Sequence, residues 1–490
     1  MGARRRSWET IYLTLQPLVI NLVGVPAMAY IVRAQGATQY GQWLTAMALV
    51  QTMTLMSSLG MRPIFVRTLA QNPEVASVRL GEQITLRAML GFAGGLIAVG
   101  ACLALRHPPI VLGCVLIAAI GLVLNGVSEC LIDTLHAFEH FTGYANVFMV
   151  SGLSLTAASV VVCWLGGGPI ALSLSYLVGP VINVLGMGAI VVRRQFRFRP
   201  QWNVARFRAL LHESRLLGRI GILSSLHERL EQLMLPKMVS PAVFGYFAAG
   251  LIPSSRLNVI PSGIITVFYP RIARACKDGT ERAVPTVQGL FMAMFLTCLP
   301  TTLGVLLFGK WIANILFPRE PDLCAWIIHI TMWSLPIVGM NWAFTSSLQA
   351  SGNHDAQARA GIKATLISFA AGAILIAAFG LRGACISWLL RPAAMWVLLM
   401  LRFRRVFPGL LGRLPFLRIA AATLIMQGAL SLGWRLLGDS LPALCATGLA
   451  ASVIFLGALV SLKVISLATL RSLARGGKEE PAPRPAVAGS

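Results

Sequence analysis

Residues Ser224–Pro261 read SSLHERLEQLMLPKMVSPAVFGYFAAGLIPSSRLNVIP, and this stretch decides how the rest of the chain is interpreted. It predicts two apolar helices joined by a short turn at residues 237–241. The ionisable residues inside the two helices are His227, Glu228, Arg229 and Glu231 in the first and Arg256, between two prolines, in the second. Such charges mean little in a soluble protein but are costly in a membrane-spanning helix.

The composition is typical of a protein that crosses the membrane many times. Of its 490 residues 56% are hydrophobic and 12% are charged, and the mean hydropathy is +0.74, whereas a soluble domain is about 25% charged. The net charge of +24 could indicate nucleic-acid binding. However, the basic residues lie in short loops between apolar runs, as membrane topology requires, so we expect a lipid bilayer and no nucleic acid as partner.

Apolar runs long enough to cross a bilayer number about fourteen, since a span needs about 20 mostly apolar residues. They cover residues 11–32, 40–61, 86–105, 109–132, 145–165, 169–192, 218–236, 242–268, 287–308, 323–349, 363–381, 383–401, 414–434 and 441–462. The predicted fold class is therefore an all-α polytopic membrane protein.

The loops predict the orientation, because short cytoplasmic loops are enriched in Lys and Arg. With the amino terminus in the cytoplasm, 31 of these residues fall on the cytoplasmic side and 7 on the other. The remaining three, Arg229, Arg256 and Arg391, fall inside spans. This asymmetry supports both the number of spans and a cytoplasmic position for the two termini.

The longest loop, residues 193–217, is strongly basic and follows the sixth predicted span. We interpret it as a cytoplasmic linker between an N-terminal six-helix bundle, residues 1–192, and a C-terminal six-helix bundle, residues 218–401. Residues 402–465 would add two transmembrane helices, and the Pro- and Ala-rich residues 466–490 predict a disordered cytoplasmic tail.

Motifs of common enzymes are missing from the sequence. It contains no GxSxG, no GxxxxGK[ST] and no HExxH. The 17 acidic residues form no pair typical of a metal or glycosidase site, and the nine cysteines include no CxxC pair. We therefore expect a transporter rather than an enzyme, with no catalytic residue, no metal and no cofactor.

The charges inside the predicted spans leave alternatives open. Arg256 lies at the depth of Glu228, so the two could form a structural ion pair, or Arg256 could face a hydrated cavity that attracts an anionic head group. Glu231 shares a helical face with Glu228 and is four residues from His227, with which it could form a protonation or cation site. Arg229 projects about 100° away from Glu228 and can meet a different neighbour.

Three further charges lie in other predicted spans or at their ends. Arg391 lies about midway along the twelfth. Glu129 and Asp133 lie near the cytoplasmic end of the fourth, where we expect both carboxylates to be solvated.

A series of short patterns follows in order through residues 11–360. They are Val32-Arg33-Ala34-Gln35-Gly36 with Gln39-Tyr40-Gly41-Gln42-Trp43, then Ser58-Leu59-Gly60-Met61 with Arg67, Glu231-Gln232-Leu233, Val243-Phe244-Gly245-Tyr246-Phe247-Ala248-Ala249, Tyr269-Pro270-Arg271, and Ser347-Leu348-Gln349-Ala350-Ser351-Gly352. Together with the span count, they resemble the O-antigen and exopolysaccharide flippases of the multidrug/oligosaccharidyl-lipid/polysaccharide (MOP) exporter superfamily. The family more often has aspartate where this chain has Glu231.

The resemblance implies two six-helix bundles forming a V around a central cavity, with extra helices after them. It also implies that polyprenyl-pyrophosphate-linked oligosaccharides are moved from the inner to the outer leaflet of the bacterial inner membrane, beside a polysaccharide polymerase and glycosyltransferases. Arg256, Arg391 and Arg229 would then meet the pyrophosphate, and Trp342 would stack on a sugar, although core packing is an alternative for Trp342. Glu231, Glu228 and His227 would have ion-coupling or structural roles.

Two rival functions follow from the same observations. A cation-coupled multidrug exporter would share the fold, but we expect its cavity to be acidic and aromatic rather than arginine-bearing. A membrane-embedded glycosyltransferase or ligase would need a large loop with catalytic groups on the non-cytoplasmic side, where the loops of this chain are short.

Overall fold

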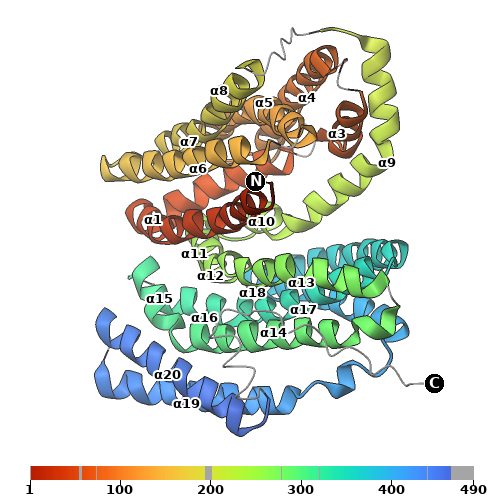
Figure 1. The fold of residues 1–490 in the computed structure, drawn as a ribbon. Coiled ribbons are helices and arrows are strands. Elements are labelled where there is room, and N and C mark those ends of the chain that lie inside the picture. The colour runs from red at the N-terminus through yellow and green to blue at the C-terminus, as the bar shows by residue number, and fades with distance from the viewer. Residues whose placement is uncertain are drawn as a thin grey trace, which may run out of the picture.

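The computed structural model describes residues 2–54, 58–72, 74, 76–138, 140–193, 201–277, 279–318, 320–438 and 440–464. Within these ranges the regular structure is helical throughout, with no strand (Figure 1). The predicted all-α fold is therefore confirmed. The predicted tail at residues 466–490 and the arginines of the linker at 194, 197 and 199 lie outside the described residues.

The first half of the chain forms one layer of packed helices (Figure 1). Its helices are α1 (Gly2–Thr52), α3 (Arg62–Gln71), α4 (Ala76–Ala104), α5 (Pro109–Ala137), α6 (Phe141–Trp164), α7 (Pro169–Tyr176) and α8 (Val178–Arg193). The long helices α4 and α5 form an antiparallel pair, and their small buried residues let the backbones approach closely.

The second half forms a separate layer below the first in the same view. Its helices are α11 (Pro241–Gly250), α12 (Ile252–Arg256), α13 (Val259–Lys277), α14 (Thr280–Leu307), α15 (Gly309–Leu316), α16 (Pro321–Thr331), α17 (Ser334–Ala350) and α18 (His354–Val406). An outer antiparallel pair, α19 (Phe416–Leu437) and α20 (Leu441–Ser461), packs on the side of α14.

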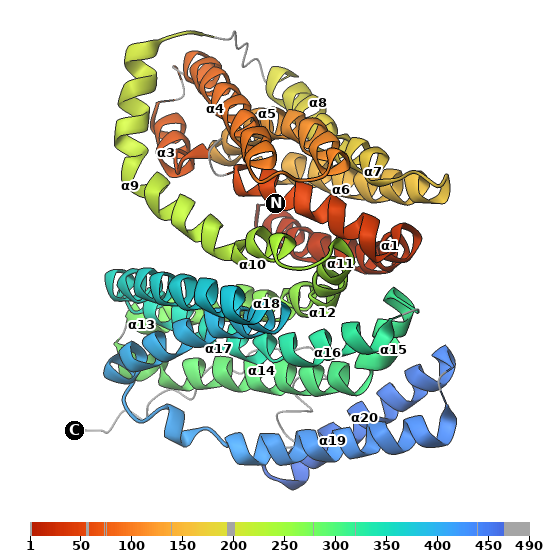
Figure 2. The same cartoon turned by 180° about the vertical axis from the view of Figure 1, so that it is seen from behind.

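A long connecting helix, α9 (Val204–Glu228), joins the two layers, followed by α10 (Leu230–Met234) and the 3-10 turn Leu235–Lys237. Both views place α9 beside α3 before it runs toward α10 (Figure 2). Two ion pairs attach it to the first layer, Arg67–Glu213 at 3.2 Å and Arg206–Glu82 at 3.5 Å. Residues 204–217 of the basic linker and the start of the predicted seventh span are thus parts of one helix.

Ten helices among the described residues are long and apolar enough to cross a membrane. This confirms a multi-pass membrane protein, whereas the number fourteen stays a prediction. Helix α18 contains two of the predicted runs, and α1 contains the first run and residues 40–52 of the second. Helix α1 kinks at Gly36 (φ 70°), and α18 kinks at Gly380 (φ 53°), a backbone conformation that glycine adopts without steric cost.

The two layers touch closely where α1 crosses α11. A Cβ atom added to Gly41 would overlap the carbonyl oxygen of Pro241, and one added to Gly245 would overlap that of Ala37. Gly41 and Gly245 belong to two of the short patterns quoted above, which therefore meet in space although they are 204 residues apart. Only glycine fits at either position, because backbone lies directly against backbone.

We therefore expect Gly41→Ala to push the layers apart and to lower the free energy of unfolding by about 1–3 kcal/mol, the usual cost of overpacking. The matched control is Gly304→Ala in α14, where the new Cβ would meet open space among the described residues. It should be neutral or stabilise by up to about 1 kcal/mol. Thermal unfolding of the two purified variants in detergent measures the difference, and equal midpoints would contradict the close crossing.

Candidate functional site

Three neighbouring cavities lie around the junction of the two layers, with volumes of about 650, 640 and 620 Å³. We call them the first, second and third cavity. They share lining residues: Asn258 lines the first and second, Glu228 the first and third, and Arg229 the second and third. The cavities are therefore adjoining parts of one polar region, each within the size range of ligand sites.

Breaks in two helices bring charged residues to these cavities. Helix α9 ends at Glu228 and α10 begins at Leu230, because Arg229 between them (φ −113°, ψ 10°) leaves the helical conformation. Helix α12 likewise ends at Arg256, before α13 begins at Val259. Non-helical backbone at membrane depth is tolerated where it is buried in protein or lines a water-filled cavity. The break also separates Glu228 from Glu231, which do not share a continuous helical face as predicted.

The second cavity collects two of the predicted binding residues, Arg229 and Arg256. The Arg229 guanidinium donates a hydrogen bond of 3.0 Å to the side-chain oxygen of Gln232, which lines the same cavity. Arg256 reaches toward α1, where its Nη1 atom would lie 3.9 Å from a Cβ on Gly24. The residues that line this cavity include two arginines and no carboxylate, within the part of the chain described.

Arg391 borders the first cavity and is held by several partners. Its Nη2 lies 3.4 Å from Glu231 Oε2, and its Nη1 donates to the backbone carbonyl of Glu228 at 3.0 Å. The guanidinium also lies 4.7 Å from the ring centre of Trp388. Glu231 itself is 1% exposed and accepts a 2.8 Å hydrogen bond from Ser387. Each oxygen of the Glu231 carboxylate therefore has an internal donor, which is the arrangement of a residue that positions Arg391.

The other predicted residues are placed as follows. His227 is buried, and its Nε2 lies 2.7 Å from the Ser368 hydroxyl of α18. The Glu228 side chain is exposed to the first and third cavities, whereas Arg256 lines the second. Trp342 is 40% exposed and lines the first cavity from α17. All seven candidates thus line or support one region, and their roles in binding remain predictions.

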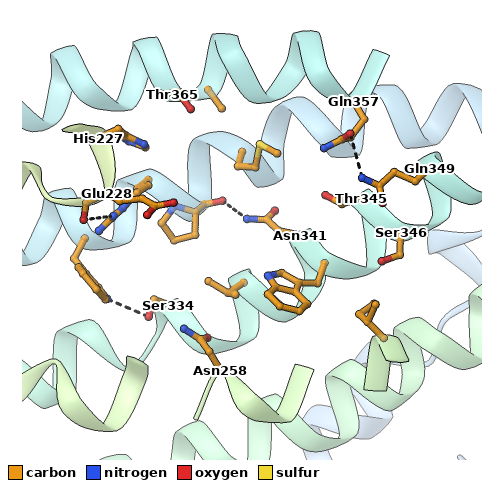
Figure 3. A pocket seen from close by; sticks show the side chains of 18 residues that line it. His227, Glu228, Asn258, Ser334, Asn341, Thr345, Ser346, Gln349, Gln357 and Thr365 are labelled. Carbon is orange, nitrogen blue, oxygen red and sulfur yellow. Dashed lines mark hydrogen bonds between the residues drawn. The ribbon is translucent and has the colours of Figure 1, made fainter. Parts of the chain in front are cut away.

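The uncharged polar lining of the first cavity was not singled out from the sequence. Figure 3 shows Asn341, Thr345 and Gln349 along α17, and Gln357 opposite them on α18. The sequence does contain a signal for this face, because residues four apart lie on one side of a helix. It is weak, since isolated Asn, Thr and Gln residues occur on many helices.

A profile of polysaccharide biosynthesis proteins matches residues 31–320, which is more than half of the chain. The chain belongs to the polysaccharide biosynthesis protein family. Its resemblance to the MOP flippases, first seen in the short patterns, is thereby confirmed.

The protein has the fold of the MOP superfamily, as comparison with solved structures shows. A structure titled "Lipid II flippase MurJ, inward closed conformation" aligns with a TM-score of 0.67 and 14% identity, over 93% of this chain and 99% of that one. An inward-facing multidrug resistance MATE transporter aligns with a TM-score of 0.55 and 14% identity, over 82% and 99%. A MOP transporter from Pyrococcus furiosus aligns with a TM-score of 0.53 and 16% identity, over 82% and 96%. No curated protein sequence matches the chain significantly.

A further sequence-based expectation, that Asp133 is solvated, is wrong. Asp133 is not solvated but 1% exposed, and it accepts from Arg87 Nη2 at 2.8 Å and lies 3.0 Å from Arg62 Nε. Arg87 is one of the 31 basic residues that the sequence assigned to the cytoplasmic side. Its side chain is fully buried because α4 and α5 pack together around it. Glu129 lies 3.7 Å from Arg87 and is 36% exposed, on the wall of the third cavity.

Arg87→Met tests whether this buried pair stabilises the first layer. The substitution keeps much of the side-chain volume but leaves the buried Asp133 with Arg62 as its ionic partner, and breaking a buried pair costs about 3–5 kcal/mol. We expect much less folded protein in the membrane and a lower unfolding temperature.

The matched control is Lys310→Met, which breaks the exposed Lys310–Asp322 pair at 2.8 Å. Exposed pairs contribute little, so this variant should behave as the wild type. Arg87→Met protein with wild-type thermal stability would show that the buried pair is dispensable.

Proposed function

We propose that this protein is a lipid-linked oligosaccharide flippase. It moves polyprenyl-pyrophosphate-linked glycan units from the cytoplasmic to the periplasmic leaflet of the bacterial inner membrane, for O-antigen or exopolysaccharide synthesis. The observation that carries the proposal is the second cavity, in which Arg229 and Arg256 face a polar space without a lining carboxylate among the described residues. Family membership supports the same conclusion.

The chemistry of the substrate fits this cavity. A pyrophosphate is the strongly charged part of a lipid-linked glycan, and it must cross the low-dielectric centre of the bilayer. Arginine binds phosphate oxygens through two parallel charge-assisted hydrogen bonds. The guanidinium groups of Arg229 and Arg256 would replace water around the pyrophosphate, while Arg391 contributes a third positive charge in the adjoining first cavity.

The way the layers meet supports alternating access. The close crossing of α1 and α11 at Gly41 and Gly245 holds the layers together at one side of the region between them. In transporters with repeated bundles, one bundle rocks against the other around a central site. The loops predict that the side of this crossing faces the periplasm, with both termini of the chain in the cytoplasm. A flippase of this kind would work beside a polysaccharide polymerase and glycosyltransferases.

The alternative of a cation-coupled multidrug exporter rests on the shared MOP fold. Glu228 and Glu129 line the third cavity and are carboxylates that a cation could reach. Both oxygens of Glu231, in contrast, already accept from Ser387 and Arg391, and the arginines of the second cavity favour an anionic substrate. A panel of drug susceptibilities measured with and without the gene separates the two functions. A transfer assay with purified protein and a labelled lipid-linked sugar would reveal a glycosyltransferase or ligase.

Replacing Glu231 tests its positioning role. Glu231→Gln keeps an oxygen for the Ser387 hydrogen bond but removes the negative charge that faces Arg391. We expect surface polysaccharide to fall at least tenfold while the amount of protein in the membrane stays unchanged.

Arg391→Gln should give the same defect, and the double variant should be no worse than either single one, because the two residues act as a pair. The control is Glu320→Gln, at an exposed carboxylate outside the cavities. Additive defects in the double variant would contradict the positioning role.

Arg256→Gln tests the proposed function itself. We expect it to insert normally but to abolish surface polysaccharide in a strain lacking its own flippase, and Arg256→Lys to restore only part, because lysine cannot bind phosphate through two parallel bonds. Arg435→Gln, at an exposed arginine of α19, is the matched control. Normal polysaccharide in the Arg256→Gln strain would overturn the proposal.

A further inference from the structure

The first and second cavities differ in chemical character. The second presents two guanidinium groups. The first has its charges at one end, with His227, Glu228 and Arg391, and only uncharged groups at the other. Figure 3 shows this gradient, with His227 and Glu228 at one side of the cavity and Gln349 and Gln357 at the opposite side.

We propose that the uncharged end of the first cavity is the glycan subsite, and that it selects neutral sugars bearing hydroxyl and N-acetyl groups. This inference rests on the proposed flippase function and assigns a separate place to the sugar. Asn258 lines both cavities, so a sugar in the first would remain joined to a pyrophosphate in the second.

Asn341 carries a buried side-chain acceptor that a ligand could satisfy. Its side chain is 7% exposed, and its Nδ2 donates to the Pro392 carbonyl at 2.8 Å. This bond fixes the orientation of the amide, whose buried Oδ1 has no hydrogen-bond partner among the described residues. An unpartnered buried acceptor is costly, and a hydroxyl or amide N–H of a sugar would satisfy it.

The neighbouring residues continue the same chemistry. Gln349 and Gln357 are joined by one long hydrogen bond of 3.5 Å, and each amide has further donors and acceptors for a ligand. Thr345 adds a hydroxyl between Asn341 and Gln349 on the same face of α17. Trp342 exposes 40% of its surface beside them, which offers an apolar plane for the face of a sugar ring.

The absence of charge at this end gives the selectivity. Sugar hydroxyls and amides exchange hydrogen bonds with Asn, Gln and Thr without burying an ion. A carboxylate on an acidic sugar would lose its hydration among uncharged side chains, which is unfavourable without an opposite charge. The subsite therefore accepts neutral sugars in preference to uronic acids.

Binding to the full-length protein in lipid nanodiscs tests the subsite with three probes. They are geranyl pyrophosphate, the same lipid carrying N-acetylglucosamine on its pyrophosphate, and the same lipid carrying glucuronic acid, each titrated by calorimetry. For the wild type we expect the neutral sugar to tighten binding at least tenfold over geranyl pyrophosphate, and the acidic sugar to tighten it less than threefold.

Two substitutions test which residues produce the sugar-dependent tightening of binding. Trp342→Ala and Gln349→Ala should each lose most of the sugar-dependent tightening while binding geranyl pyrophosphate within twofold of the wild type. Trp326→Ala, at a tryptophan of similar exposure that does not line the cavity, should retain the full gain. Arg256→Gln should weaken all three probes alike.

The outcomes separate the two proposals. Equal binding of the sugar-bearing and sugar-free lipids by the wild type, or a gain that survives both α17 substitutions, would overturn the subsite while leaving the flippase function intact. An equal or larger gain for the acidic sugar would overturn its selectivity. Failure of all probes to bind would overturn the proposed function itself.

Discussion

The free-energy cost of placing a charge at membrane depth governs the organisation of this protein. Each inward charge therefore needs an opposite charge or water. Two pairs provide the opposite charge: Arg87 lies 2.8 Å from Asp133, and Arg391 lies 3.4 Å from Glu231. Arg229 and Arg256 line a cavity of about 640 Å³, whose described lining includes no carboxylate. The buried ion pairs hold helices together, and the two cavity-lining arginines are the positive charges that the proposed anionic ligand would meet.

The same cost shapes the backbone. Arg229 and Arg256 both lie where a helix ends, and non-helical backbone at membrane depth is tolerated where it lines a cavity. The helix breaks and the charges therefore occur together at the cavities. Where the layers must instead meet without water, the chain uses glycine, and Gly41 and Gly245 allow backbone to lie directly on backbone.

The sequence was sufficient for properties that depend on composition and spacing. Apolar runs predicted the all-α multi-pass fold, and the charges in residues 224–261 predicted where a polar region would form. Side-chain partners depend on which helices pack together, which spacing along one chain does not reveal. Arg87 was therefore assigned to a loop and Asp133 to solvent, although they bury each other. The break at Arg229 was missed because no proline or glycine marks it. The uncharged face of α17 was missed because its Asn, Thr and Gln residues carry no charge that would mark it in the sequence.

The walls of the two cavities come from different parts of the molecule, and this has a consequence for transport. The described lining of the first cavity lies entirely between His227 and Met395, at the end of α9 and in the second layer. The second cavity combines Trp43 and Gln51 of α1, in the first layer, with Arg229 and Arg256.

If the layers rock as rigid bodies, the first cavity keeps its shape while the second opens and closes. A sugar in the first cavity would then move with the second layer. The contacts of the second cavity with the pyrophosphate would change between the inward and outward states. Release would be controlled at the charged group common to all lipid-linked glycans, whereas selection would occur at the sugar.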